Sequence, residues 1–111
     1  MDILFVRTNL KKLCNSDKRL KKKYGSQCAK EIRERLDELR DFPTLHDLRS
    51  IPMPQCHELT GDKKGYLAVK AGKSNRIILK PPNSTPRKQD GGLDWKRVTQ
   101  ITVAKIEDYH D

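Results

Sequence analysis

The chain has 111 residues, and its 24 Lys plus Arg against 15 Asp plus Glu give a formal net charge of +9. A chain of this length folds around one core, so a Rossmann or barrel enzyme is excluded and we expect a single domain over residues 1–111. Hydrophobic residues make up 34% and charged residues 35% of the chain, and the apolar residues recur periodically, which argues against disorder throughout.

The sequence carries no signal for a membrane, a cofactor or a disulfide framework. No run approaches the roughly 18 apolar residues of a membrane span, and the start over 1–6 lacks a cationic segment and a cleavage site, so we expect a soluble, unprocessed chain. The three cysteines form no CxxC pair, so we expect no metal site, no cofactor and a cytoplasmic location. A charge of +9 attracts nucleic acids and the ribosome, although an acidic protein partner fits the charge equally well.

The N-terminal part of the sequence predicts one strand followed by two helices. Residues Asp2–Val6 are β-branched, aromatic or apolar, which is typical of a strand. Helical spacing from Leu10 predicts a first helix that Gly25 ends, and a second helix ends before Pro43. The apolar stripe of the second helix is Ala29, Ile32, Leu36 and Leu39. The many lysines and arginines of this amphipathic hairpin fit either a solvated helix face or a phosphate-attracting one.

The C-terminal part changes from helical spacing to alternation. It predicts an antiparallel meander of strands over 55–59, 66–71 and 75–80, an exposed, mobile loop over 81–92, and a last strand over 98–106. In the last strand Ile101 and Val103 point to one side, whereas Val98, Ala104 and Ile106 point to the other. This pattern indicates either burial on both faces or a β-bulge.

These elements predict an α+β fold in which the helical hairpin packs on one face of a small, mainly antiparallel sheet. The apolar face with Leu67, Val69 and Ala71 is the surface that can bury the helical stripes. The opposite face then stays open, and its polar residues on the two central strands are Tyr66, Lys70, Arg76 and Lys80. A cationic and partly aromatic sheet face suits a single-stranded nucleic acid, although such faces are often simply Lys-rich.

Titratable residues gather around this predicted open face. They are His57, Lys63, Lys64, Asp108, Tyr109 and His110. Cleavage of RNA without a metal needs a base for the 2′-hydroxyl proton, an acid for the leaving oxygen and cations for the charge on phosphorus, and these residues supply all three. Each also has a structural interpretation: a hydrogen-bonded histidine in a strand, ordinary turn lysines and a histidine beside the chain end.

The same residues carry a resemblance to a known family. The basic hairpin, the runs 57–66 and 75–77, the loop end over 90–95 and the final 106–110 resemble the HigB-like branch of the RelE/ParE toxin superfamily. The match spans nearly the whole chain and is strongest over 57–76 and at the last five residues. Members are toxins of type II toxin–antitoxin modules, and the ribosome-dependent members cut messenger RNA in the decoding site without a metal.

The resemblance implies a role for each matching residue. His57 would be an active-site imidazole, and Lys63 or Lys64 would bind phosphate, with Lys64 the choice for the catalytic lysine. Arg76 would hold the scissile phosphate. Tyr109 and His110 would complete the site by stacking and proton transfer, with Asp108 orienting them. The residues expected to contact RNA outside the reacting atoms are Lys63, Tyr66, Lys70, Lys80 and Asp108.

We therefore expect a metal-independent endoribonuclease toxin that cuts mRNA on the ribosome and is held in a hetero-oligomer by a HigA-like antitoxin covering the basic face. Two alternatives stay open. A ParE-like relative blocks DNA gyrase and cuts no RNA, although the joint presence of His57, Arg76, Tyr109 and His110 argues against it. A basic RNA-binding module without chemistry is the other alternative, and its affinity would fall steeply with salt.

Overall fold

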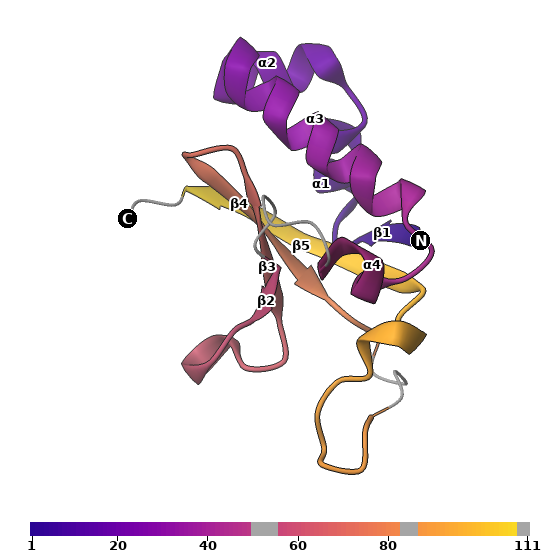
Figure 1. Cartoon of the computed structure of the whole chain (residues 1–111). Coiled ribbons are helices and arrows are strands. Elements are labelled where there is room, and N and C mark those ends of the chain that lie inside the picture. The colour runs from indigo at the N-terminus through magenta and orange to yellow at the C-terminus, as the bar shows by residue number, and fades with distance from the viewer. Residues whose placement is uncertain (50–55, 83–86, 109–111) are drawn as a thin grey trace.

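The computed structural model of the chain describes residues 1–49, 56–82 and 87–108, and it places a helical layer against one face of a five-stranded sheet (Figure 1). The order of elements is β1 (Asp2–Phe5), α1 (Thr8–Cys14), α2 (Asp17–Tyr24), α3 (Ser26–Asp41), α4 (Leu45–Arg49), β2 (His57–Glu58), η1 (Gly61–Lys63), β3 (Leu67–Ala71), β4 (Asn75–Lys80), η2 (Trp95–Arg97) and β5 (Gln100–Asp108). In the sheet the strands follow the order β1-β5-β4-β3-β2. Strand β1 is parallel to β5, and the other neighbours are antiparallel. This architecture confirms the predicted α+β fold class.

The predicted first helix is two helices. It breaks after Cys14, and the Ser16 hydroxyl accepts a hydrogen bond at 3.2 Å from the backbone N–H of Arg19, which caps the start of α2. Asp17, at the start of α2, is exposed and pairs with Arg33 of α3 at 2.7 Å. No helix within the described residues is long and apolar enough to cross a membrane.

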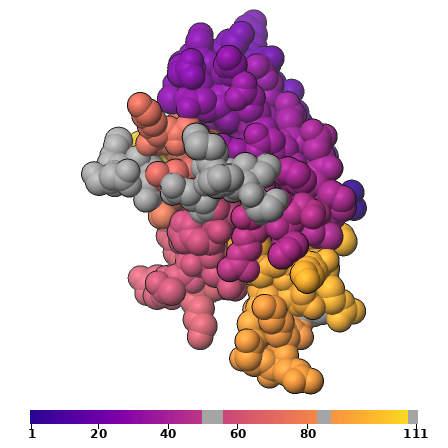
Figure 2. Space-filling model, viewed as in Figure 1, coloured from indigo at the N-terminus to yellow at the C-terminus, as the bar shows by residue number. Residues whose placement is uncertain are grey.

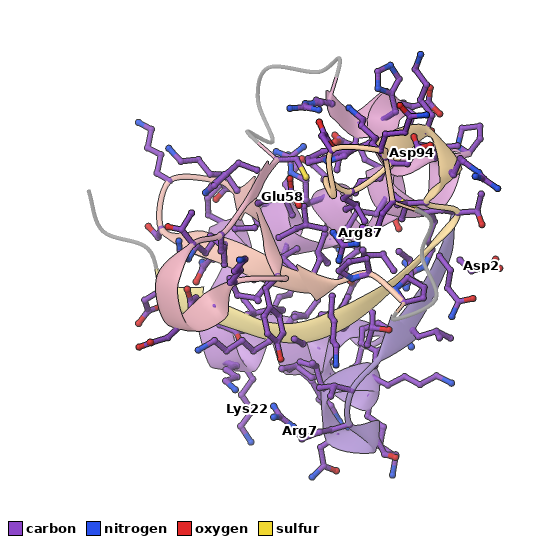
Figure 3. The ribbon with its side chains drawn as sticks, turned by 90° about the horizontal axis from the view of Figure 1, so that it is seen from below. Asp2, Arg7, Lys22, Glu58, Arg87 and Asp94 are labelled. Carbon is purple, nitrogen blue, oxygen red and sulfur yellow. The ribbon has the colours of Figure 1, made fainter. Side chains whose placement is uncertain are left out.

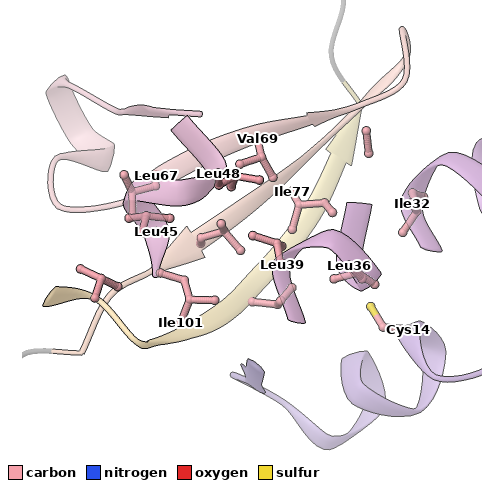
Figure 4. Packing of buried hydrophobic residues seen from close by; sticks show 14 of the residues in the cluster. Cys14, Ile32, Leu36, Leu39, Leu45, Leu48, Leu67, Val69, Ile77 and Ile101 are labelled. Atoms are coloured by element: carbon pink, nitrogen blue, oxygen red, sulfur yellow. The ribbon is translucent and has the colours of Figure 1, made fainter. Parts of the chain in front are cut away.

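The core lies between α3 and the sheet, as Figure 4 shows. The four stripe residues of α3 are each 1% exposed or less, so the predicted stripe is confirmed. Leu39 packs in the same cluster as Ile77 and Ile101 from the sheet (Figure 4). This packing fixes which face of the sheet is covered by helices and which face remains available to a ligand.

The predicted meander is confirmed with different bounds: its second strand begins at Leu67 rather than at residue 66, and the last strand is Gln100–Asp108 rather than 98–106. Strand β2 has only two residues, whereas β4 has the predicted bounds. Strands β3 and β4 join at a turn that contains Gly72, whose φ of 76° suits a glycine. In the following loop, Arg87 and Leu93 form an isolated bridge, and Leu93 and Trp95 are buried. Residues 83–86 of the loop lie outside the described residues. The mobility predicted for the loop stays a prediction.

Strand β5 contains the β-bulge that the sequence offered as one of two readings. Val103 lies opposite Leu79 and Lys105 lies opposite Ile78, so Ala104 is the extra residue of β5. The bulge reverses the alternation, so Ile106 packs against the core on the same side as Val103. The sequence had placed Ile106 on the opposite side, and that placement is wrong because a single extra residue exchanges the faces of everything that follows it.

Candidate nucleic-acid interface

Two rungs of the sheet bring the polar residues of the open face together. His57, Ala68, Ile78 and Lys105 lie opposite one another across β2, β3, β4 and β5. The next rung on the same face, two residues along each strand, joins Lys70, Arg76 and Glu107. Residues directly opposite one another in adjacent strands share a face, and the rungs between carry residues of the core cluster, so both of these rungs face away from the helices. Ala68 and Ile78 in the first rung are apolar and only 1% and 2% exposed.

Three cations converge on the carboxylate of Glu107. Arg76 Nε donates to Glu107 Oε1, and Lys63 Nζ donates to Oε2 at 3.0 Å. Lys105 Nζ lies 2.8 Å from the same Oε2. We call these four residues the Glu107 cluster. Three positive groups against one carboxylate leave this part of the open face cationic.

The Glu107 carboxylate is held ionised by its neighbours. Its side chain is 18% exposed, and although burial alone would raise its pKa, hydrogen bonds from Lys105, Lys63 and Arg76 lower the pKa to about 2. A carboxyl group whose pKa is depressed by folding contributes stability that is fully present above its ordinary pKa, here 4.5, and is lost as the pH falls from there through the folded pKa. The cluster therefore stays charged throughout the neutral and mildly acidic range.

The two adjacent lysines of the η1 region point to different neighbours. Lys63 joins the Glu107 cluster, whereas Lys64 is exposed and lines a hollow of about 270 Å³ with Lys80 and Arg87. A further hollow between the η1 region and the loop before η2 is lined by Glu58, Lys64 and Arg87. Figure 3 places Glu58 and Arg87 near each other in projection, and Figure 2 shows the η1 region and this loop protruding as two lobes. Lys64 thus belongs to a second basic area.

Tyr66 lies between these two areas. It is half-buried and lines a hollow of about 400 Å³ with Lys63, Ile78 and Lys105. It also lines the smaller hollow that holds Lys64 and Lys80. The larger hollow has apolar material from Ile78 and Ala104 in its lining, flanked by lysine side chains. An apolar surface with an aromatic ring between two sets of cations suits a base flanked by its phosphates.

His57 is exposed and sits in the same rung as Lys105, at the far edge of the sheet. Two strand spacings and two residues separate it from Arg76, which puts their Cα atoms on the order of 12 Å apart. The histidine and the arginine therefore share the open face, with the Arg76 side chain directed toward Glu107 of β5, on the side of β4 away from β2.

Asp108 does not share a face with Arg76. It lies opposite Asn75 in the rung that carries Ala71, on the side of the helices. Burial, Cys14 and Asp108 raise the pKa of the Tyr24 hydroxyl in α2, which places this carboxylate near the helical layer. Tyr109 and His110, which follow directly in sequence, lie outside the described residues.

The remaining predicted residues lie at the margins of the open face. Lys80 is opposite Thr102 and exposed, and Lys70 is opposite Arg76 near the β3–β4 turn. The Lys70 carbonyl accepts a hydrogen bond from Arg35 Nε of α3 at 2.6 Å, so this end of β3 is tied to the helical layer.

Two of the cysteines are held as protonated thiols. Burial raises the pKa of Cys14 to about 11 and that of Cys56 to about 12, so neither thiol is an ionised nucleophile at neutral pH. Within residues 1–49, 56–82 and 87–108, no three His, Cys, Asp or Glu side chains gather as metal ligands would.

Solved structures share this architecture over the full length of the chain. A YoeB/ParE toxin from Agrobacterium tumefaciens superposes with a TM-score of 0.56 at 10% identity, covering 99% of this chain and 100% of the other. The chain has the RelE/ParE-like toxin fold. A YoeB–YefM complex from Staphylococcus aureus gives a TM-score of 0.54 at 14% identity, covering 100% of this chain and 98% of the other. No family model and no curated protein matches the sequence.

Within the RelE/ParE-like fold, sequence reasoning missed three residues of the open face. Glu107 stood in the C-terminal motif without an assigned role, Lys105 was passed over as part of a strand, and Arg87 was treated as part of a featureless loop. Glu107 follows Lys105 by two residues, so the two share a face of the strand, and the alternation of the apolar residues is broken in the same strand. This combination is the signal that could have pointed to the Glu107 cluster.

Proposed function

We propose that this protein is the toxin of a type II toxin–antitoxin module, of the HigB-like branch, and that it cuts mRNA on the ribosome in the cytoplasm as one domain. The observation that carries the proposal is the convergence of Lys63, Arg76 and Lys105 on one point of the open sheet face. Such a convergence of cations suits a phosphodiester whose negative charge increases during cleavage. The fold, shared with a chain named as a YoeB/ParE toxin, agrees with it.

The RNA strand would cross the open face from one basic area to the other. A scissile phosphate at the Glu107 cluster puts the adjacent base into the hollow beside Tyr66. The next phosphate then meets Lys64, Lys80 and Arg87. Backbone contacts from lysine and arginine with stacking on one aromatic ring are the usual means of holding a single strand. Asp108, on the other face, has no place on this path.

The reaction we propose is attack of a ribose 2′-oxygen on the adjacent phosphorus. The new P–O2′ bond forms as the P–O5′ bond breaks, which leaves a 2′,3′-cyclic phosphate and a 5′-hydroxyl. One of His57 and His110 accepts the 2′-hydroxyl proton, and the other donates a proton to the leaving 5′-oxygen. Arg76 and Lys63 stabilise the charge on the phosphoryl oxygens, and Tyr109 stacks on the base or assists proton transfer.

A HigA-like antitoxin is the proposed protein partner. One structural relative is a YoeB–YefM complex, and the net charge of +9 favours an acidic partner segment on the open face. Expression of the chain alone should arrest growth, and co-expression of the neighbouring open reading frame should relieve the arrest through a toxin–antitoxin hetero-oligomer that purifies as a complex.

The direct test uses purified protein, ribosomes and a defined message. We expect cuts in the message that carry 2′,3′-cyclic phosphate ends and appear only when ribosomes are present. Intact message under these conditions contradicts the nuclease proposal. A parallel supercoiling assay with DNA gyrase separates the ParE-like alternative, because inhibition of gyrase with intact message would assign the toxicity to protein contacts.

The two adjacent lysines should differ in their effect on cleavage. Lys63→Met removes a donor to Glu107 from the proposed phosphate site, so we expect cleavage of ribosome-bound message to fall about 10-fold or more. Lys64→Met, with the same loss of charge one residue away, should have a smaller effect, seen mainly as weaker RNA binding. Single-turnover rates of both variants decide the order, and a larger loss for Lys64→Met would return the catalytic role to Lys64.

A further inference from the structure

We propose that Glu107 is an internal ligand of the phosphate site, which occupies the cations of the open face and must yield them when RNA binds. This inference deepens the proposed function and rests on its assignment of the open face to RNA. It assigns to Glu107 the control of affinity rather than a step in the chemistry.

The Glu107 carboxylate is surrounded by donors in the way a bound anion would be. The Glu107 carboxylate accepts hydrogen bonds from Arg76 Nε of β4 and, at 3.0 Å, from Lys63 Nζ of η1. It also lies 2.8 Å from Lys105 Nζ of β5. Donors from three separate elements meet at this one carboxylate. A carboxylate and a phosphate oxygen accept from the same arginine and lysine donors, so the two anions compete for the same positions.

The cluster is also open to an incoming anion. The side chains of Lys63 and Lys105 are 40% and 47% exposed, so the carboxylate is reached by solvent through lysines that can swing outward. The hollow beside Tyr66 is lined by the same two lysines. The phosphate of a nucleotide whose base lies in that hollow therefore arrives at the donors that Glu107 occupies.

The bulge at Ala104 is what brings this carboxylate to the site. Without the extra residue, Glu107 would keep the face of Ile101 and Val103, toward the helices. With it, Glu107 lies opposite Arg76. Because the carboxylate is ionised at neutral pH, its competition with phosphate is a constant property of the free protein rather than a pH switch.

The test is binding of a 2′-O-methyl RNA oligonucleotide, which cannot be cleaved because its 2′-oxygen is blocked. Glu107→Gln keeps the shape of the side chain and removes its charge, so we expect binding to tighten about 10-fold or more. The salt dependence should steepen, with a slope of log K against log salt larger by about 0.7 for one more phosphate neutralised. Equal or weaker binding by Glu107→Gln overturns the inference and makes Glu107 a scaffold for the cations.

Two further variants separate competition from general charge. Glu34→Gln makes the same charge change on the exposed side of α3 and should leave affinity as in the wild type. The double variant Glu107→Gln, Lys30→Gln restores the net charge through an exposed lysine of α3, leaves the three donors in place, and should still bind more tightly than the wild type. Wild-type affinity in the double variant overturns the inference, because charge alone would then explain the single variant.

The binding measurement tests the role of Glu107 whether or not the protein cuts RNA. If the wild type binds the oligonucleotide and Glu107→Gln binds it more tightly, while no message is cut on ribosomes, the nuclease proposal fails and the internal ligand stands. If neither protein binds the oligonucleotide at low salt, the phosphate site itself is refuted.

Discussion

Arg76→Ala should lower cleavage of ribosome-bound message at least ~100-fold, because it removes the guanidinium that meets the charge developing on the phosphoryl oxygens. Arg76 is 23% exposed and sits in the middle of the open face, opposite Lys70 on one side and Glu107 on the other. After the substitution, Glu107 keeps Lys63 and Lys105 as partners, so no carboxylate is left unpaired. The loss is measured in single-turnover rates at saturating ribosome.

Two comparisons make this result specific. Arg33→Ala removes an exposed arginine of α3 that pairs with Asp17, and it should leave the rate unchanged. Arg76→Lys keeps the charge but loses the planar fork, and it should give an intermediate rate. Thermal unfolding of each variant checks that the fold is retained. A wild-type rate for Arg76→Ala would remove the arginine from the proposed site.

Local patterns predict most of the fold because the decisive residues are close in sequence. The stripe on α3 requires only helical spacing, and the β3–β4 hairpin requires alternation around the turn at Gly72. The break between α1 and α2 was missed although Ser16 and Asp17 are a typical helix start. The apolar residues Leu13 and Leu20 continue a helical period across the break, and that period outweighed the capping signal.

The composition of the site depends on features that act over longer distances. The sequence assigned the open-face carboxylate to Asp108, whereas the structure puts Glu107 opposite Arg76 and Asp108 toward the helices. A bulge exchanges the two faces, and its position depends on which pairing of β4 with β5 buries Ile106 together with Val103. Broken alternation indicated that a bulge was possible but did not say after which residue it stands.

The choice between Lys63 and Lys64 is a similar case. Both lie in or beside one short 3₁₀ turn, and the sequence pattern treats them alike. The turn directs Lys63 toward Glu107 and Lys64 toward Arg87, which comes from a loop more than twenty residues away. Contacts between distant segments decide the roles of adjacent residues, so composition and spacing could identify the basic face without dividing it into two areas.

The three histidines of the chain should separate into two that support cleavage and one that does not. His57→Ala and His110→Ala should each slow cleavage at least ~100-fold, because a positioned proton-transfer group contributes about 10²–10⁴-fold. His46→Ala is the matched control, since His46 is exposed on α4, in the helical layer rather than on the open sheet face. The measurement is again the single-turnover rate on programmed ribosomes. If all three variants cleave the message at the same rate, His57 and His110 are not the acid and base of the reaction.

The dependence of the rate on pH distinguishes proton transfer from simple binding. Imidazole is the side chain whose charge ordinarily changes between pH 5 and 8, so a base and an acid of this kind give a bell-shaped profile. Each single histidine variant should lose one limb of that profile. The double variant should be little slower than the slower single variant, because groups that act in one step are not additive. Losses that multiply in the double variant, with both limbs retained, would instead assign the histidines to RNA binding.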